Sequence, residues 1–184
     1  MSDTRPRRVV VTGATPARLR GRAPRGDDAE VVVVSVGQPD PAPAEAARLA
    51  AELGAYDLIS VGVATGRVTP AAATVLGACD LVVTATDAVW DGAATGADAV
   101  RLGLAIETAD DAEAAAAALA AELGSFAGGA LASTKRMVDS VAGADLTAAL
   151  ALESDLQTAL LTSPAHRRIV AGMAARAGER PAQT

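Results

Sequence analysis

Few side chains in this 184-residue chain have the type and spacing for acid–base chemistry. Residues 66–90, GRVTPAAATVLGACDLVVTATDAVW, read as a loop, a small-residue helix and a buried strand, and the first half offers no group that could move a proton. Asp91 and Asp98 follow this stretch as candidate acids. Aspartate is also common in turns and at helix starts, and we favour those two roles for them.

A nucleophile or a metal site has equally little support. Ser133 and Thr134 precede Lys135, but neither a histidine nor a second carboxylate is placed to activate a hydroxyl. His166 is the only histidine, which leaves a conventional zinc site short of ligands, and we expect it to be exposed. Cys79 is the only cysteine, so an intrachain disulfide is excluded and a packing role is favoured.

Composition and charge narrow the class of protein. Hydrophobic residues make up 51% of the chain and aromatics 2%, which predicts close packing of Ala, Val and Leu and argues against a base-stacking surface. The net charge of -6 disfavours nucleic-acid binding, although residues 1–26 carry seven arginines and one aspartate. We interpret that start as a solubilising arm. No apolar run reaches membrane-spanning length, so a cytoplasmic protein without a membrane role is expected.

The elements that must position these residues are those of an α/β protein, because short β-branched runs alternate with Ala/Leu-rich segments. A helix is predicted within residues 41–54, and another begins at Pro70. Strands are predicted at 8–12, 30–36, 58–64 and 81–85. After residue 90 the strand pattern stops, and helices are predicted at 97–102, 110–123, 127–141, 146–161 and 164–176. The predicted organisation is a basic arm with the first strand (1–28), a β/α core (29–106), a helical region (107–178) and a tail (179–184).

A similarity to dinucleotide-binding enzymes at the start of the chain is not supported by the residues that such a site needs. The start RRVVVTGATPARLRGR is similar to the first strand and glycine loop of a short-chain dehydrogenase. A dinucleotide loop needs further glycines so that the backbone can approach the pyrophosphate, and here side chains fill those positions. The Tyr-x-x-x-Lys pair of that family is also absent after Tyr56. No nicotinamide cofactor is therefore predicted.

A second similarity covers roughly residues 30–176. Gly66, the pair Cys79-Asp80 and LVVTATDAVW follow one another in the order and spacing of the crotonase superfamily, the enoyl-CoA hydratase/isomerase family. Further on, residues 95–140 (TGADAVRLGLAIETADDAEAAAAALAAELGSFAGGALASTKRMVDS) and 149–168 (ALALESDLQTALLTSPAHRR) resemble its Ala-rich helix pair and closing helices. The sequence thus resembles a shortened and divergent member of that family.

The resemblance implies a truncated spiral β/α core with a C-terminal helical region for oligomerisation, often into trimers. It also implies a ligand, an acyl-CoA thioester, and no further cofactor or metal. In this family two backbone N–H groups stabilise the enolate oxygen, and two glutamates handle protons. Carried over, the resemblance assigns thioester binding to the backbone of Gly66, Ala71 and Ala72. It leaves Thr74 and Asp91 as catalytic candidates, with Thr74 aligned to the first glutamate.

The phosphates of CoA could meet Arg101, Lys135 and Arg136, because guanidinium and ammonium groups bind phosphate. A solvated helix face is the alternative interpretation for all three. For Thr74 the alternative is a small helical residue packed on the sheet. The family's consecutive glycines are replaced by Pro70, Ala71 and Ala72. Where the second glutamate is expected, only Asp91 and Asp98 are available, and the family's segment between that glutamate and the next helix is deleted.

Three functions remain open from the sequence. The first is an atypical hydratase/isomerase-like protein without the usual glutamates, acting as an acyl-CoA-binding or accessory subunit. It would form homo-oligomers, or assemble with an active crotonase homologue or an enzyme of fatty-acid or polyketide metabolism. The second is an active CoA-thioester enzyme that transfers a proton through an enolate. The third is a purely structural oligomer subunit.

Overall fold

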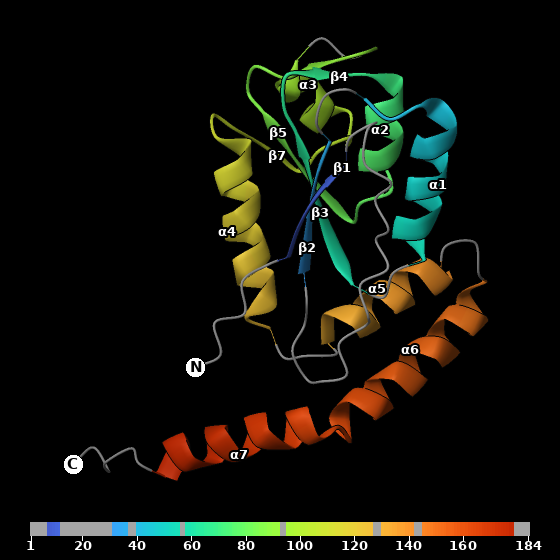
Figure 1. The fold of residues 1–184 in the computed structure, drawn as a ribbon. Coiled ribbons are helices and arrows are strands. Elements are labelled where there is room, and N and C mark those ends of the chain that lie inside the picture. Colours follow the sequence, from blue (N-terminus) through green and yellow to red (C-terminus); the bar gives the residue numbers. More distant parts are fainter. Residues whose placement is uncertain are drawn as a thin grey trace.

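The computed structural model describes residues 7–11, 31–36, 40–55, 58–92, 95–126, 130–141 and 145–178, which form a parallel sheet with helices on both faces (Figure 1). The five-stranded sheet has the order β1-β2-β3-β5-β7, and each neighbouring pair is parallel. Its strands are β1 (Arg7–Val11), β2 (Val31–Val36), β3 (Ile59–Ala64), β5 (Leu81–Ala85) and β7 (Glu107–Ala109). The α/β prediction is confirmed.

Strand β2 shows why helices lie on both sides of the sheet. Successive side chains of a strand point to opposite faces, and this strand is valine on both. Val32 and Val34 belong to a buried cluster with Leu49 of helix α1 (Pro43–Gly54). Val31 and Val33 belong to the cluster that includes helix α4 (Ala112–Gly124). A strand buried on both faces reads as a continuous apolar run, which is how the sequence revealed it.

Small residues allow the helices to approach closely. Ala112, Ala116 and Ala120 of α4 are at most 2% exposed and lie one turn apart along one face of the helix. On the other side of the sheet, helix α2 (Pro70–Leu76) packs over β3, where a Cβ on Gly62 would lie only 3.0 Å from Cδ2 of Leu76. Alanine and glycine thus allow the close packing of helices on the sheet that the low aromatic content predicts.

The expectation of helices alone after residue 90 is wrong, because β7 lies at one edge of the main sheet. This strand pairs Val83 with Glu107, and its side chains are mostly exposed. A three-residue edge strand is held by backbone hydrogen bonds and needs no hydrophobic alternation. The sequence therefore contains no pattern from which this strand could be predicted. A second, unpredicted sheet of two strands consists of β4 (Arg67–Val68) and β6 (Val89–Trp90).

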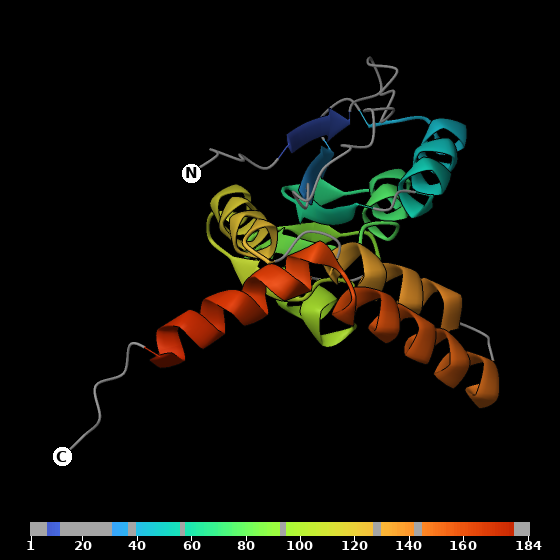
Figure 2. The same cartoon turned by 90° about the horizontal axis from the view of Figure 1, so that it is seen from below.

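The remaining helices follow the predicted ranges closely. They are α3 (Gly96–Arg101), α5 (Ala130–Val141), α6 (Leu146–Leu161) and α7 (Pro164–Gly178). Helix α5 packs near β3, α6 packs on α5, and α7 leads away from the sheet (Figures 1 and 2). None of the described helices is both long and apolar enough to span a membrane.

Candidate functional site

The start of α2 is where the sequence predicts a thioester-binding backbone. Thr69 is the N-cap residue, and its Oγ1 accepts a hydrogen bond from the N–H of Ala72 at 3.3 Å. Ala71 lies beside it in the first turn and is half-buried. Gly66 has a φ of 57°, and its carbonyl accepts from the N–H of Val89 at 2.8 Å. The hydrogen bond of the Ala72 N–H therefore caps the helix. The hydrogen bond of the Gly66 carbonyl connects the chain before β4 to Val89 of β6.

A small cavity lies beside this helix start. The cavity between Thr65, Arg67 and Ala72 has a volume of about 10 Å³. That is roughly the space of one water molecule, whereas ligand pockets usually enclose about 300–1,000 Å³. This cavity by itself has no room for a thioester group.

The two catalytic candidates have other partners. Thr74 is exposed, and its hydroxyl donates to the carbonyl of Pro70 at 2.8 Å, one turn earlier in the helix. The alternative expectation that Thr74 packs on the sheet is wrong, because Ala72 and Leu76 occupy the buried side of this helix. Asp91 forms an ion pair with Arg67, with the nearest N–O distance 3.2 Å and both side chains substantially exposed.

Arg101, the first candidate for CoA phosphate, pairs with an acid on its own helix. Its guanidinium lies 3.0 Å from Oδ1 of Asp98, one turn earlier in α3. Asp98 also accepts from the hydroxyl of Thr95, the N-cap residue, at 2.9 Å. The hydrogen bonds from Arg101 and Thr95 hold the pKa of Asp98 below its ordinary value. The predicted helix-start role of Asp98 is thereby confirmed.

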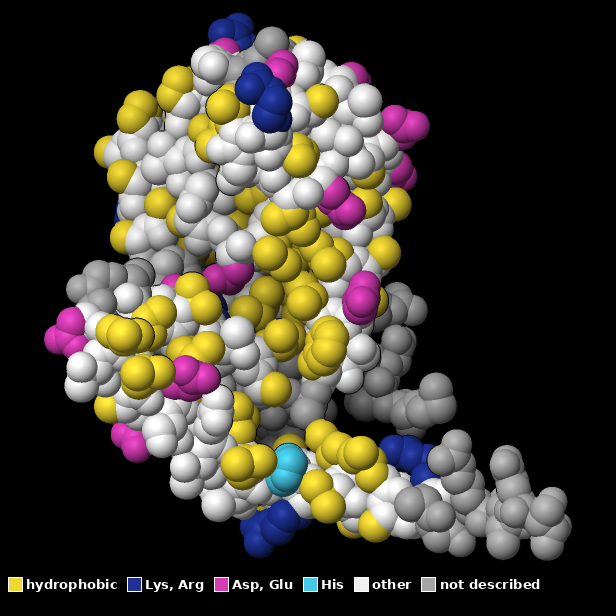
Figure 3. Space-filling model, turned by 180° about the vertical axis from the view of Figure 1, so that it is seen from behind, with side chains coloured by type: hydrophobic (Ala, Val, Ile, Leu, Met, Phe, Trp, Pro, Cys, Tyr) yellow, Lys and Arg dark blue, Asp and Glu magenta, His cyan; other side chains and the backbone are white. Residues whose placement is uncertain are grey.

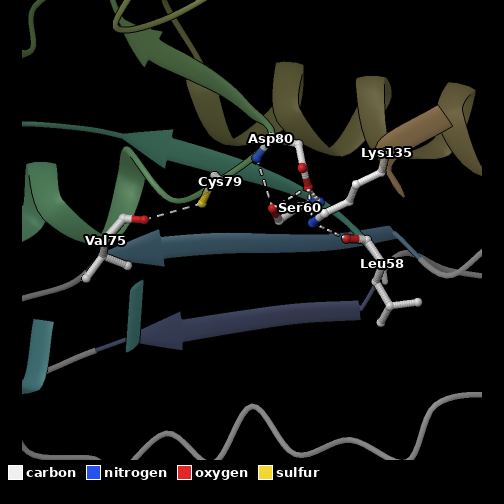
Figure 4. Close-up of polar contacts among 6 residues, drawn as sticks. All are labelled: Leu58, Ser60, Val75, Cys79, Asp80 and Lys135. Carbon is white, nitrogen blue, oxygen red and sulfur yellow. Dashed lines mark hydrogen bonds and ion pairs between the residues drawn. The ribbon is translucent and has the colours of Figure 1, made fainter. Parts of the chain in front are cut away.

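Lys135 is buried, so the interpretation of this side chain as part of a solvated face is wrong. Its ammonium group lies 3.0 Å from Oδ2 of Asp80 and 3.0 Å from the carbonyl of Leu58 (Figure 4). The same carboxylate oxygen accepts from the N–H and the hydroxyl of Ser60, each at 2.7 Å. The neighbouring Arg136 is exposed and donates to Ser133, so the two basic residues have different surroundings.

We call Ser60, Asp80 and Lys135 the anchor cluster, because they join α5 to the sheet. Asp80 precedes β5 and Ser60 lies at the start of β3, so the cluster lies at the amino ends of the parallel strands. Ligands of open α/β sheets usually bind at the carboxyl ends, which favours a structural role for the cluster. Sequence reasoning missed it, since 55 residues separate Asp80 from Lys135 and no periodicity relates them.

Cys79 lies next to the anchor cluster and is half-buried. Its thiol points toward the carbonyl of Val75, with 3.7 Å between sulfur and oxygen. Burial, with a further contribution from the Asp80 carboxylate, raises the pKa of Cys79 to about 12, against smaller opposite effects of Ser60 and Lys135. A thiol that stays protonated is a poor nucleophile, which agrees with the predicted packing role.

A larger hollow lies elsewhere on the core. We call it the β5 groove: it has a volume of about 310 Å³ and is bounded by α2, the start of β5 and the loop before β7. Leu76, Trp90 and Ile106 contribute to its apolar lining, and Asp80 and Asp91 also reach it. The back of the molecule shows apolar side chains gathered in a hollow that runs toward the C-terminal helices (Figure 3). No group of three or more metal-ligating side chains occurs among the described residues.

No family model and no curated protein matches the sequence. Solved structures do match the fold. An enoyl-CoA hydratase of Mycobacterium smegmatis is 14% identical, with a TM-score of 0.67 over 78% of this chain and 77% of that one. An enoyl-CoA hydratase of Polaromonas sp. JS666 is 22% identical, with a TM-score of 0.67 over 83% and 81%. A putative enoyl-CoA hydratase/isomerase of Mycobacterium abscessus is 18% identical, again at 0.67, over 79% of each chain.

These structures share the overall fold of about four fifths of the present chain, as the resemblance in the sequence implies. At such identities the match concerns the backbone and carries over no residue's role. The chain has the crotonase fold, the fold of the enoyl-CoA hydratase/isomerase family.

Proposed function

We propose that this chain is a catalytically inactive crotonase-fold subunit whose role is to assemble with other subunits. The main support for the proposal is the set of contacts at the start of helix α2. Thr74 offers no carboxylate and turns outward, the Ala72 N–H serves the helix cap, and the adjacent cavity is about 10 Å³. An enolate mechanism needs donors and a base that converge on one substrate atom, whereas the Ala72 N–H and the Thr74 hydroxyl are each bonded within their own helix start.

The C-terminal helices support a role in assembly. Helix α6 has sixteen residues and none of them is buried, although many are leucine or alanine. Leu146, Leu150 and Leu161 of α6 are 74%, 55% and 58% exposed. Large apolar side chains exposed along one helix favour an interface with another protein. Most soluble oligomers are homo-oligomers, so we propose a homo-oligomer, with a related active subunit as the second possible partner.

The first experiment separates an inactive subunit from an enzyme. Purified full-length protein is assayed for hydration and isomerisation of short- and medium-chain enoyl-CoA substrates, and calorimetry measures binding of CoA and octanoyl-CoA. We expect no turnover and no CoA binding. Saturable turnover that Asp91→Asn abolishes would refute the proposal and favour the alternative of an active thioester enzyme.

A second variant tests why activity is absent. Thr74→Glu restores a carboxylate at the position that the resemblance aligns with the first glutamate. Because Thr74 is exposed and lies outside the lining of the small cavity, we expect no gain of hydratase activity from this change alone. Thr86→Glu, at another exposed threonine, is the matched control. Activity gained by Thr74→Glu and not by the control would mean that a working thioester site survives.

A further inference from the structure

The β5 groove has the size and the walls of a small-molecule site. Its volume of about 310 Å³ lies at the lower end of the range for ligand pockets, roughly 300–1,000 Å³. Leu104 and Ile106 line it and are 47% and 49% exposed, whereas Trp90, also in the lining, is 5% exposed. The N–H of Ile106 donates to the carbonyl of Val82 at 2.8 Å, which holds this wall against β5. The apolar wall is therefore already formed in the single chain.

The polar side chains of the groove offer hydrogen-bond acceptors. Asp80 and Asp91 are its charged residues, and the described part of the lining contains no lysine, arginine or histidine. The Cys79 thiol, also in the lining, points toward the carbonyl of Val75 in α2. A ligand that satisfies these carboxylates must supply hydrogen-bond donors, and a cationic donor gains most because bonds between charged groups are the strongest.

Asp80 has an acceptor that the protein does not use. Its Oδ2 accepts from the N–H and the hydroxyl of Ser60 and from the ammonium group of Lys135 (Figure 4). Its Oδ1 accepts no hydrogen bond from the residues that the structure describes. The Asp80 side chain is 23% exposed, so water or a ligand can reach it. One carboxylate oxygen of a groove residue is therefore available to a donor from outside the chain.

The positive partners of the two aspartates are not part of the groove lining. Lys135 is 6% exposed and meets Asp80 from α5, and Arg67 pairs with Asp91 through a side chain that is 71% exposed. These partners balance the two negative charges, so the groove attracts a cation by direct contact with carboxylates rather than through a long-range field. The Arg67 pair is solvent-exposed and therefore weak, so a ligand cation can compete with it.

We propose that the β5 groove binds a small primary amine with an apolar body. The ammonium group donates to the unused oxygen of Asp80, with Asp91 as a second acceptor, and the apolar body lies against Leu76, Leu104 and Ile106. A ligand that ends in a carboxylate is disfavoured, because it would place a negative charge beside the two aspartates. The site is separate from the start of α2, and the proposal goes beyond the assembly role.

A matched series of ligands tests the charge preference on the full-length protein. Octylamine, octanol and octanoate have the same chain length and differ in the charge of the end group at neutral pH. Calorimetry should show saturable binding of octylamine, at least about tenfold tighter than binding of octanol or octanoate. The fluorescence of Trp90, the only tryptophan, should change with the same midpoint because this side chain lines the groove.

Variants locate the binding in the groove. Ile106→Arg places a positive charge in the apolar wall and should weaken octylamine binding by at least about tenfold. Val138→Arg, at a 56% exposed residue of α5, is its matched control and should bind octylamine as the wild type does. Asp91→Asn should weaken binding by about threefold, since this carboxylate is partly exposed to solvent. Asp87→Asn, at an exposed aspartate outside the lining, should leave it unchanged.

Circular dichroism establishes that each variant is folded before its binding is compared. Absence of octylamine binding, or equal binding of octanol, would overturn the proposal. Stronger binding of octanoate or octanoyl-CoA would assign the groove to an acyl ligand and overturn it as well. Octylamine binding that is unchanged in Ile106→Arg would place the amine elsewhere, with the same consequence.

The amine site and the inactive subunit fail in different measurements. Enoyl-CoA turnover together with octylamine binding would refute the inactive subunit and leave the amine site standing. Loss of the amine site without any turnover would do the reverse.

Discussion

Replacing Lys135 by methionine should lower the free energy of unfolding by roughly 3 kcal/mol, because it breaks an ion pair whose ammonium group is buried. The side chain of Lys135 is 6% exposed and that of Asp80 is 23% exposed, so solvent screens this pair far less than a surface pair. Removing one partner of a buried pair typically costs about 3–5 kcal/mol. The low end applies here, since Asp80 keeps two hydrogen bonds from Ser60 and some contact with water.

The converse change should cost more. Asp80→Asn leaves an ammonium group that is almost fully enclosed, with the Leu58 carbonyl and a neutral amide oxygen as acceptors. The double variant leaves no charge at this position, so its loss should be smaller than the sum of the single losses by at least about 1 kcal/mol. Urea unfolding followed by the fluorescence of Trp90, the only tryptophan, measures all three.

Arg101→Met is the matched control for Lys135→Met. It removes another basic partner of an aspartate, but the Arg101 side chain is 72% exposed, so the change should stay within about 0.5 kcal/mol. A loss for Lys135→Met as small as that of the control would refute the structural role of the anchor cluster. The structural role would also be refuted if the stability losses of the two single variants added up to the loss of the double variant. If Lys135 bound a CoA phosphate instead, its replacement would weaken CoA binding and leave stability nearly unchanged.

Two further predictions concern buried polar groups. The Cys79 thiol, with a pKa of about 12 against an ordinary 9.0, should lose a proton more easily in the unfolded chain, so stability should fall from about pH 9 to pH 12, by up to about 4 kcal/mol. Cys79→Ser should remove most of that fall in urea titrations, and thiol reagents at pH 8 should label native Cys79 far more slowly than the unfolded chain. Thr84→Val should cost about 1–3 kcal/mol in the same urea assay, because the buried Trp90 Nε1–H donates to the Thr84 hydroxyl at 3.0 Å. Thr86→Val, at an exposed hydroxyl, should cost under about 0.5 kcal/mol, and equal losses in the two threonine variants would contradict the role of that bond.

The sequence was informative wherever one local rule decided the structure. The valine run of β2 needs helices on both faces, Pro70 begins α2 because its missing N–H is harmless at that position, and Leu146–Leu161 is a helix with the predicted bounds. The sequence was uninformative where backbone hydrogen bonds alone determine whether a strand forms. Strand β7 is held by pairing with β5, and β4 and β6 are two residues each, too short for any alternation.

The residues of the candidate site also differ in whether the sequence alone could predict their roles. Local chemistry identified Asp98 as a helix-start residue, since a cap depends on neighbours three residues apart. Lys135 was misjudged because the sequence around it is that of an amphipathic helix with basic residues, where a solvated side chain is the common outcome. Its burial depends on Asp80, which meets it only after the sheet and α5 have packed. Long-range pairs of this kind have no signature in a single sequence.

The position of the anchor cluster bears on the proposed assembly role. The cluster and the α2 helix start lie toward opposite ends of the strands, so changes in residues 66–74 leave the bonds of Lys135 to the core untouched. The buried pair connects α5, and through it α6 and α7, to the sheet. Because the helical region is anchored independently of the α2 helix start, the proposed assembly role does not depend on which residue stands at position 74. We therefore expect Lys135→Met to weaken assembly along with stability, and Thr74→Glu to affect neither.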